Sequence, residues 1–268
     1  MLLRENDGVK YFVFESLEKT GVVNHCFSTR VGGVSQGAYQ WLTLSFTRGD
    51  EREKVTENFK RITKAIQSDI SHMVSASQVH DTKIRHVTKE DCGKGILRES
   101  DLKGYDGLMT NEPGVLLTTF HADCVPLYFV DPIKRVIALS HAGWRGTVNR
   151  MAEKTVDEMT QVYGCSVCDI ITGIGPAIGR CCFEVGEEVA LEFREKIPCS
   201  SQFIRPMADK EGKYKIDLKG INRHLLEEKG VAQISVADQC TMCMPQYFYS
   251  HRRMGEERGS MAAFLELR

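Results

Sequence analysis

Three side chains that can bind a metal lie between residues 80 and 141, each in a short polar segment next to an apolar stretch. His80 ends the triplet QVH, Cys124 ends ADC, and His141 begins HAGWRG. Two imidazoles and one thiolate make a tetrahedral zinc site whose fourth position stays open. An open zinc polarises a substrate and lowers the pKa of bound water to about 7. The pattern favours a catalytic metal over a structural one.

A packed interior would explain the same residues. Buried free cysteine is common, and a lone histidine is more often hydrogen-bonded in a core than bound to a metal. The intervals between the three residues match no short metal motif. Asp123 or His121 could orient a ligand, but a strand would point Asp123 and Cys124 to opposite faces unless it bends. The residues alone leave both interpretations open.

The elements that must position these side chains form a mixed pattern of strands and helices. Hydrophobic periodicity predicts helices at residues 51–66, about 147–163, 187–196 and 218–229. Apolar runs predict strands at residues 12–15, 25–29, 73–79, 136–140, 169–174 and 234–236, and two within 114–130. Because the order is not a regular βαβ alternation, the pattern favours an α+β fold, a mixed β-sheet core flanked by helices.

Composition limits the classes of partner. A chain of 268 residues that is 42% hydrophobic can bury one large core, so we expect a single catalytic domain over residues 1–268. With 35 basic and 36 acidic residues there is no global field for nucleic acid or a membrane, so a small molecule is the expected substrate. No apolar run reaches the roughly 18 residues of a membrane span, and the N-terminal residues mix charged with apolar side chains where a signal peptide would be continuously apolar. We expect a cytoplasmic monomer or homodimer whose ten cysteines are reduced thiols.

Several sequence blocks occur together in the order seen in one known family. They are FSTRVGGVS at 27–35, QVH at 78–80, DGLMT at 106–110, ADCVP at 122–126, HAGWRG at 141–146, GIGP at 173–176 and CCFEV at 181–185. The chain resembles the YfiH/YlmD-like polyphenol oxidase, or laccase-domain, proteins, which are regarded as purine nucleoside phosphorylases. The resemblance runs from about residue 20 to the FYSHRR segment at 248–253.

This resemblance implies a fold similar to the YfiH-like and cytotoxic necrotizing factor-like α/β sandwich. It also implies zinc, with copper as the alternative metal, held by His80, Cys124 and His141. The implied activities are phosphorolysis of adenosine, inosine, guanosine and methylthioadenosine, together with deamination of adenosine. The chain departs from the family pattern at Asp81, where glycine is common, at His121, where threonine is common, and at Thr43, where asparagine is usual.

Each implied reaction makes its own demand on the site. Phosphorolysis needs phosphate held beneath the anomeric carbon, and guanidinium binds phosphate oxygens in a bidentate manner. Arg30, in a glycine-bearing loop, and Arg145, after Trp144, are the expected catalytic and substrate-binding arginines, although surface ion pairs would look the same. Deamination needs an activated water, and Asp123 is the expected catalytic carboxylate for moving its proton.

The remaining motifs carry weaker hypotheses. Two pairs with Cys-x2-Cys spacing, Cys165 with Cys168 and Cys240 with Cys243, could together bind a second, structural zinc, but buried thiols are the simpler interpretation. The Cys181-Cys182 pair is expected to pack against the preceding Gly-Pro turn. Trp144 could stack on a purine or lie in the core. The HRR segment at 251–253 could close a pocket or form a solvated basic cluster.

Three rival functions stay open from the sequence. A metal-free hydrolase would use Cys124 as nucleophile and His141 as base, as the cysteine and histidine of the cytotoxic necrotizing factors do. That dyad does not need His80. A copper-dependent polyphenol oxidase would need additional histidine pairs, and His-x-His occurs nowhere in the chain. A non-catalytic binding protein would leave an open metal position without a purpose.

Overall fold

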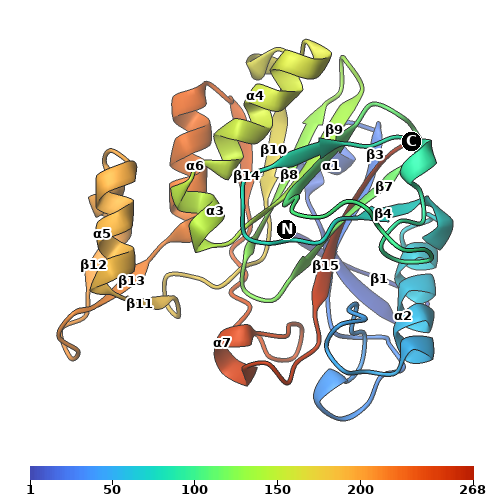
Figure 1. Ribbon diagram of the computed structural model, residues 1–268, viewed down its shortest axis with the longest axis horizontal. Helices are drawn as coiled ribbons and strands as arrows, with labels where there is room; N and C mark the ends of the chain where they lie inside the picture. The colour runs from blue at the N-terminus through green and yellow to red at the C-terminus, as the bar shows by residue number, and fades with distance from the viewer.

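Two six-stranded sheets lie face to face in the computed structural model, which describes residues 1–268 (Figure 1). The first sheet has the order β1 (Leu2–Asn6), β2 (Val9–Val13), β3 (Val23–Ser28), β15 (Met261–Leu267), β7 (Leu116–His121) and β4 (Met73–Ser75). The second has the order β14 (Gln233–Val236), β10 (Ile171–Ile174), β8 (Val125–Asp131), β9 (Val136–Ala142), β6 (Gly107–Thr110) and β5 (Ile84–His86). A small third sheet joins β11 (Glu184–Gly186), β13 (Lys213–Ile216) and β12 (Ile204–Pro206).

Seven helices accompany the three sheets. They are α1 (Glu15–Glu18), α2 (Arg52–Ala65), α3 (Trp144–Val148), α4 (Met151–Tyr163), α5 (Glu187–Lys196), α6 (Leu218–Lys229) and α7 (His251–Met254). Short 3₁₀ turns lie at Gly37–Tyr39, Ile70–His72, Lys89–Asp91, Val167–Asp169 and Ser200–Phe203. In Figure 1, α3, α4 and α6 gather on one side of the molecule, α2 lies on the other, and α5 stands with the small sheet at the periphery. No helix is both long and apolar enough to cross a bilayer.

Strand alternation separates the interior into layers. Along β15, Ala263 and Leu265 point into the apolar cluster between the two sheets, whereas Ala262 and Phe264 belong to the cluster under α2. Successive strand residues face opposite sides, so a strand with both faces covered is apolar throughout. All seven residues of β15 are buried for this reason. The layers are α2, the first sheet, the second sheet, and α3, α4 and α6.

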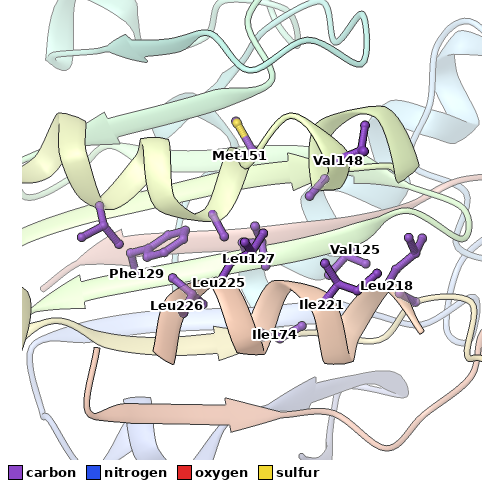
Figure 2. Close-up of a cluster of buried hydrophobic side chains, with 14 of the residues drawn as sticks. Val125, Leu127, Phe129, Val148, Met151, Ile174, Leu218, Ile221, Leu225 and Leu226 are labelled. Carbon is purple, nitrogen blue, oxygen red and sulfur yellow. The ribbon is translucent and has the colours of Figure 1, made fainter. Parts of the chain in front are cut away.

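The largest apolar cluster lies between the second sheet and its helices (Figure 2). Ile221 and Leu225 of α6 pack with Leu127 and Phe129 of β8, and Met151 of α4 joins the same cluster. Each such side chain contributes about 1.5–3 kcal/mol when it is fully buried. This cluster holds β8 and β9 rigidly, and these two strands carry the segments with Cys124 and His141.

The predicted α+β class with a mixed sheet core is confirmed. Helices predicted at 187–196 and 218–229 coincide with α5 and α6, and α2 lies within the predicted 51–66. The predicted helix at 147–163 is wrong at its start, because α3 and α4 are separate helices joined through Arg150, whose φ is 64°. A left-handed residue interrupts the helical hydrogen-bond series.

Other strand predictions were wrong in their bounds or missing. The predicted strand at 12–15 ends at Val13, and α1 begins at Glu15. The predicted strand at 73–79 ends at Ser75, which leaves Gln78 and His80 in a loop. No strand was predicted at β15, although its antiparallel pairing with β3 and β7 places it in the middle of the first sheet. Six of its seven residues are apolar, Glu266 being the exception, so the strand does not show the alternation of a half-exposed strand.

Candidate metal centre

His80, Cys124 and His141 converge, although they come from three separate segments. Their nitrogen and sulfur atoms all lie within 4.8 Å of one another. Cys124 Sγ is 3.8 Å from His80 Nε2, and the two imidazole rings have centroids 5.0 Å apart. Zinc bonds of about 2.0–2.3 Å would allow one tetrahedral ion to reach all three atoms. The donor set and its spacing therefore fit a single metal ion.

The loop that carries His80 is shaped around a buried carboxylate. Asp106 is 1% exposed and accepts hydrogen bonds from the backbone N–H groups of Val79, His80 and Asp81 at 2.9–3.0 Å. His80 has a φ of 63°, which lets consecutive N–H groups turn toward one acceptor. Asp106 immediately precedes β6, which pairs with β9. That pairing is what places the His80 loop beside His141.

Asp106 also fixes the orientation of the His141 ring. Its Oδ1 atom lies 2.8 Å from His141 Nδ1, so His141 Nε2 is left for the cavity side. Burial alone would raise the pKa of Asp106, but the His141 ring and the N–H groups of Val79 and Asp81 outweigh burial and lower it. Carboxylate support of this kind fixes which nitrogen of a histidine ligand can coordinate.

Electrostatics favour a thiolate at Cys124. Burial opposes ionisation of the thiol, but the facing His141 and His80 rings bring the pKa of Cys124 down to about 6. Burial also opposes charge on His141, yet the Cys124 thiolate and Asp106 raise the pKa of His141 to about 9. A thiolate is both the metal-binding and the nucleophilic form of cysteine. The site therefore presents sulfur in the form that either a metal ion or a covalent mechanism would use.

The expected role of Asp123 as support for a ligand is wrong, because its carboxylate is engaged elsewhere. It accepts hydrogen bonds from Thr241 Oγ1 at 2.6 Å, from Ser250 Oγ at 2.9 Å and from the backbone N–H of Arg252 at 2.7 Å. Asp123 has a φ of 93°, so the chain bends here as direct involvement required, but the carboxylate points to these three partners. Asp106, which nothing in the DGLMT block marks as a partner of a metal ligand, is the carboxylate that contacts His141.

His121 lies behind the site. It is 2% exposed, and its ring lies 2.8 Å from Thr119 Oγ1 and 3.1 Å from the carbonyl oxygen of Cys124. Burial and the neighbouring His141 hold the pKa of His121 well below its usual value, so the ring stays neutral. A neutral ring that bonds the Cys124 backbone stabilises the turn between β7 and β8.

A cavity of about 580 Å³ opens over the three residues. Its charged and titratable lining groups are His80, Cys124, His141, His121, Arg48, His251, Glu256 and Arg258. Arg258 is 6% exposed, and its Nη2 donates to no protein acceptor, whereas Arg48 pairs with Glu256. Ser45, Ser77, Gln78 and Phe120 also line the space. The possible metal ligands and the buried guanidinium of Arg258 therefore line the same cavity.

Arg30 and Arg145, the arginines expected to bind substrate, do not line this cavity. Arg30 Nε donates to the carbonyl oxygen of Gln40 at 2.9 Å, and its guanidinium lies 4.7 Å from the Tyr249 ring. Arg145 is exposed, with its guanidinium 4.3 Å from the Trp144 ring. Neither side chain lines the space over the three ligands. Arg30 therefore links its own loop to Gln40 and Tyr249, and Arg145 packs over the Trp144 ring.

The other residues singled out in the sequence divide between the cavity and the interior. His251 lines the cavity, in line with one of the two interpretations of the 251–253 segment, whereas Arg253 donates to the carbonyl oxygens of Thr241, Met242 and Phe248. Thr43 is buried and accepts from the N–H of Ser260, a lining residue. Trp144 packs against the core cluster under α3 and α4.

The proposed pairing of the two Cys-x2-Cys motifs is wrong. Cys165 and Cys168 belong to no group of candidate metal ligands. Cys240 and Cys243 instead lie beside Cys181 and Cys182, with all four sulfurs within 4.8 Å of one another. Pairing by spacing failed because the loop after β10 approaches the loop after β14 only in the folded chain.

Residues 24–268 match a family model described as multi-copper polyphenol oxidoreductase laccase. The chain belongs to this laccase-like family. A Bacillus subtilis relative named purine nucleoside phosphorylase YlmD is 37% identical over 245 residues, which cover 90% of this chain and 87% of that protein. The crystal structure of the Bacillus licheniformis hypothetical protein YfiH superposes with a TM-score of 0.92 at 33% identity, covering 99% of both chains.

The names within the laccase-like family point to more than one chemistry. A relative from an unknown prokaryotic organism, 36% identical over 240 residues, which cover 87% of this chain and 90% of that protein, is named adenosine deaminase RL5. The family description itself refers to copper. In this laccase-like chain the candidate metal ligands form two groups, one with two histidines and a cysteine and one with four cysteines. The expected resemblance to YfiH and YlmD proteins is confirmed.

Proposed function

We propose that this chain is a zinc-dependent purine nucleoside phosphorylase in which residues 1–268 act as one catalytic domain. The convergence of His80, Cys124 and His141 beneath a polar cavity carries the proposal. Relatives named purine nucleoside phosphorylase supply the reaction class. The proposed substrates are adenosine, inosine, guanosine and methylthioadenosine, each with phosphate. The cytoplasmic location and the monomeric or dimeric state stay predictions.

His80, Cys124 and His141 would hold the metal. Two nitrogens and a thiolate with an open fourth position are typical of catalytic zinc, and soft sulfur also suits copper. When bound, zinc supplies a Lewis acid and an activated water. Asp106 keeps His141 in the tautomer whose Nε2 is free, and the N–H groups of residues 79–81 hold Asp106 in place.

Arg258 replaces Arg30 and Arg145 as the proposed phosphate-binding residue. Its guanidinium is buried at the cavity and retains an unused donor end at Nη2. Phosphate bound there would bring an oxygen to the anomeric carbon of the nucleoside. That oxygen forms the new bond to carbon as the glycosidic bond breaks, and the bonding electron pair leaves with the purine. The departing purine takes up a proton to become the free base. The other product is ribose 1-phosphate, or its methylthio derivative when methylthioadenosine is the substrate.

Adenosine deamination is the second proposed activity, because the relative RL5 is named an adenosine deaminase. Deamination replaces the purine amino group with oxygen from water and releases ammonia. His251 and Glu256 lie in the same cavity and are titratable groups that could hold or move a proton there. Asp123 becomes a positioning residue in this proposal, because its contacts with Thr241 and Ser250 hold the Cys124 turn.

The test measures base release from inosine with and without phosphate. We expect hypoxanthine only with phosphate present, and we expect Cys124→Ala to abolish both phosphorolysis and deamination. Cys199→Ala, which changes an exposed cysteine that does not line the cavity, is the matched control. Phosphate-independent release would identify a hydrolase instead.

The metal-free hydrolase is the strongest rival. The lowered pKa of Cys124 and the raised pKa of His141 favour the thiolate–imidazolium pair that a cysteine nucleophile would use. His80 separates the two functions, because its Nε2 lies 3.8 Å from the same sulfur and a dyad does not need it. Under the metal proposal, His80→Ala loses zinc and activity together. Full activity without bound zinc would favour the hydrolase.

A further inference from the structure

Four cysteines outside the cavity form a second cluster of possible metal ligands. Cys181 and Cys182 lie in the loop between β10 and β11, and Cys240 and Cys243 lie in the loop after β14. Cys182 Sγ is 3.3 Å and Cys181 Sγ is 3.7 Å from Cys243 Sγ, and no two of the four sulfurs are more than 4.8 Å apart. Zinc–sulfur bonds of about 2.3 Å place tetrahedral sulfurs about 3.8 Å apart. The observed spacing is close to that tetrahedron.

The surroundings of the cluster suit concentrated negative charge. The backbone N–H of Gly179 donates to Cys240 Sγ at 3.2 Å. Lys219 is 7% exposed, and its ammonium binds the carbonyl oxygens of Ala237 and Gln239, just before Cys240. Cys181 and Cys240 also line a hollow with five basic and two acidic side chains, the basic ones being Arg180, Arg205, Lys215, Lys219 and Arg223. One zinc with four thiolates carries a net charge of about −2, and the five basic side chains around the hollow offset this charge.

We propose that Cys181, Cys182, Cys240 and Cys243 bind a structural zinc ion. Four protein thiolates leave no open position, so this metal would not react with substrate. The sulfur separations of 3.3 Å and 3.7 Å are too long for disulfide bonds, which need about 2.05 Å. All ten cysteines are free thiols in this structure. A single ion accounts for the convergence of all four.

The proposed zinc would brace the turn that carries Cys124. Thr241, next to Cys240, donates to the Asp123 carboxylate at 2.6 Å. Ile178, in the loop that carries Cys181, donates its N–H to the Asp123 carbonyl oxygen at 2.9 Å. Both cysteine loops therefore bind the residue that precedes Cys124. An ion that holds these two loops together would limit the movement of the turn at Asp123 and Cys124, because each loop is hydrogen-bonded to Asp123.

Zinc content per chain is the direct test, measured on full-length protein purified under reducing conditions with zinc. The Cys181→Ser, Cys243→Ser double variant changes two exposed ligands, and the Cys168→Ser, Cys199→Ser double variant is the matched control with two exposed cysteines elsewhere. We expect about two zinc ions in the wild type and control and about one in the cluster variant. Circular dichroism checks that each variant is folded.

Zinc content equal to that of the wild type in the folded cluster variant would overturn the proposal. Cobalt replacement in Cys124→Ala provides a second measurement, because that protein lacks the catalytic thiolate. A strong thiolate-to-cobalt absorption band must then arise from the cluster, and its absence would also overturn the proposal. The two sites are separable: if Cys124→Ala kept the full zinc content, the proposed function would fail while the structural site stood.

Discussion

Asp106 lies 2.8 Å from His141 Nδ1 and at the same time accepts three backbone N–H groups from the loop that bears His80. One buried carboxylate therefore sets both the ring orientation of one candidate ligand and the backbone position of another. Its three N–H donors belong to the QVH block and the residue after it. This arrangement makes Asp106 the residue whose replacement tests the proposed centre without removing a ligand.

Asp106→Asn should weaken zinc binding at the proposed catalytic centre. The amide cannot accept hydrogen bonds from all four present donors, and the loss of such support lowers metal affinity about 10–100-fold. A chelator competition assay measures the zinc affinity of each protein. The exposed Asp209→Asn is the control and should bind like the wild type. Unchanged affinity in Asp106→Asn would mean that the carboxylate only shapes the loop.

Arg258→Ala should raise the KM for phosphate about tenfold or more, since hydrogen bonds to charged groups contribute about 1.5–3 kcal/mol. We expect this increase in KM because the guanidinium of Arg258 is buried at the cavity and is the proposed phosphate-binding group. Initial rates of inosine cleavage at varied phosphate measure it. Arg145→Ala, which changes an exposed arginine outside the cavity, should leave the KM near its wild-type value. The reverse result would restore Arg145 as the phosphate ligand.

His25 should make the fold sensitive to acid. Its Nε2 accepts the N–H of Phe14 at 2.8 Å, and burial, aided by the charge of Arg268, lowers the pKa of His25 to about 3. The unfolded chain takes up a proton near its ordinary pKa of about 6.5, which the folded chain does not. The free energy of unfolding therefore decreases as the pH falls from about 6.5 toward 3, by at most about 1.4 kcal/mol per pH unit from this group.

Urea unfolding of His25→Gln and of the wild type between pH 8 and pH 4 tests this prediction. Glutamine has a side-chain oxygen that can accept a hydrogen bond but takes up no proton in this range. The difference in unfolding free energy between the two proteins should shrink or reverse as the pH falls. A constant difference across the range would show that His25 does not titrate between the two states.

Phe264→Ala should destabilise the first sheet. Phe264 is fully buried on β15 in the cluster under α2, and removal of such a ring costs about 3–5 kcal/mol. Thermal and urea unfolding measure the loss. Leu3→Ala on the edge strand β1 changes a side chain that is 40% exposed and should cost far less. Equal losses would mean that the cluster under α2 does not support the fold.

Local periodicity was enough to predict α2, α5 and α6, because an amphipathic helix records its buried face within its own sequence. Residue type and position beside apolar stretches made His80, Cys124 and His141 possible metal ligands, although packing in the core stayed an open interpretation of the same residues. The family resemblance also required only the sequence blocks. Nothing in these blocks distinguished the carboxylate that orients a ligand from those that hold loops.

Tertiary structure decided those contacts. Pairing of β6 with β9 brought Asp106, not Asp123, to His141. The approach of two distant loops joined Cys240 and Cys243 to Cys181 and Cys182, and the same folding placed Arg258 in the cavity while Arg30 remained outside. Helical periodicity is a property of neighbours in the chain, whereas a site depends on which strands pair and where their loops meet. The sequence by itself therefore determined the candidate ligands, and only the pairing of strands and the meeting of distant loops decided their partners.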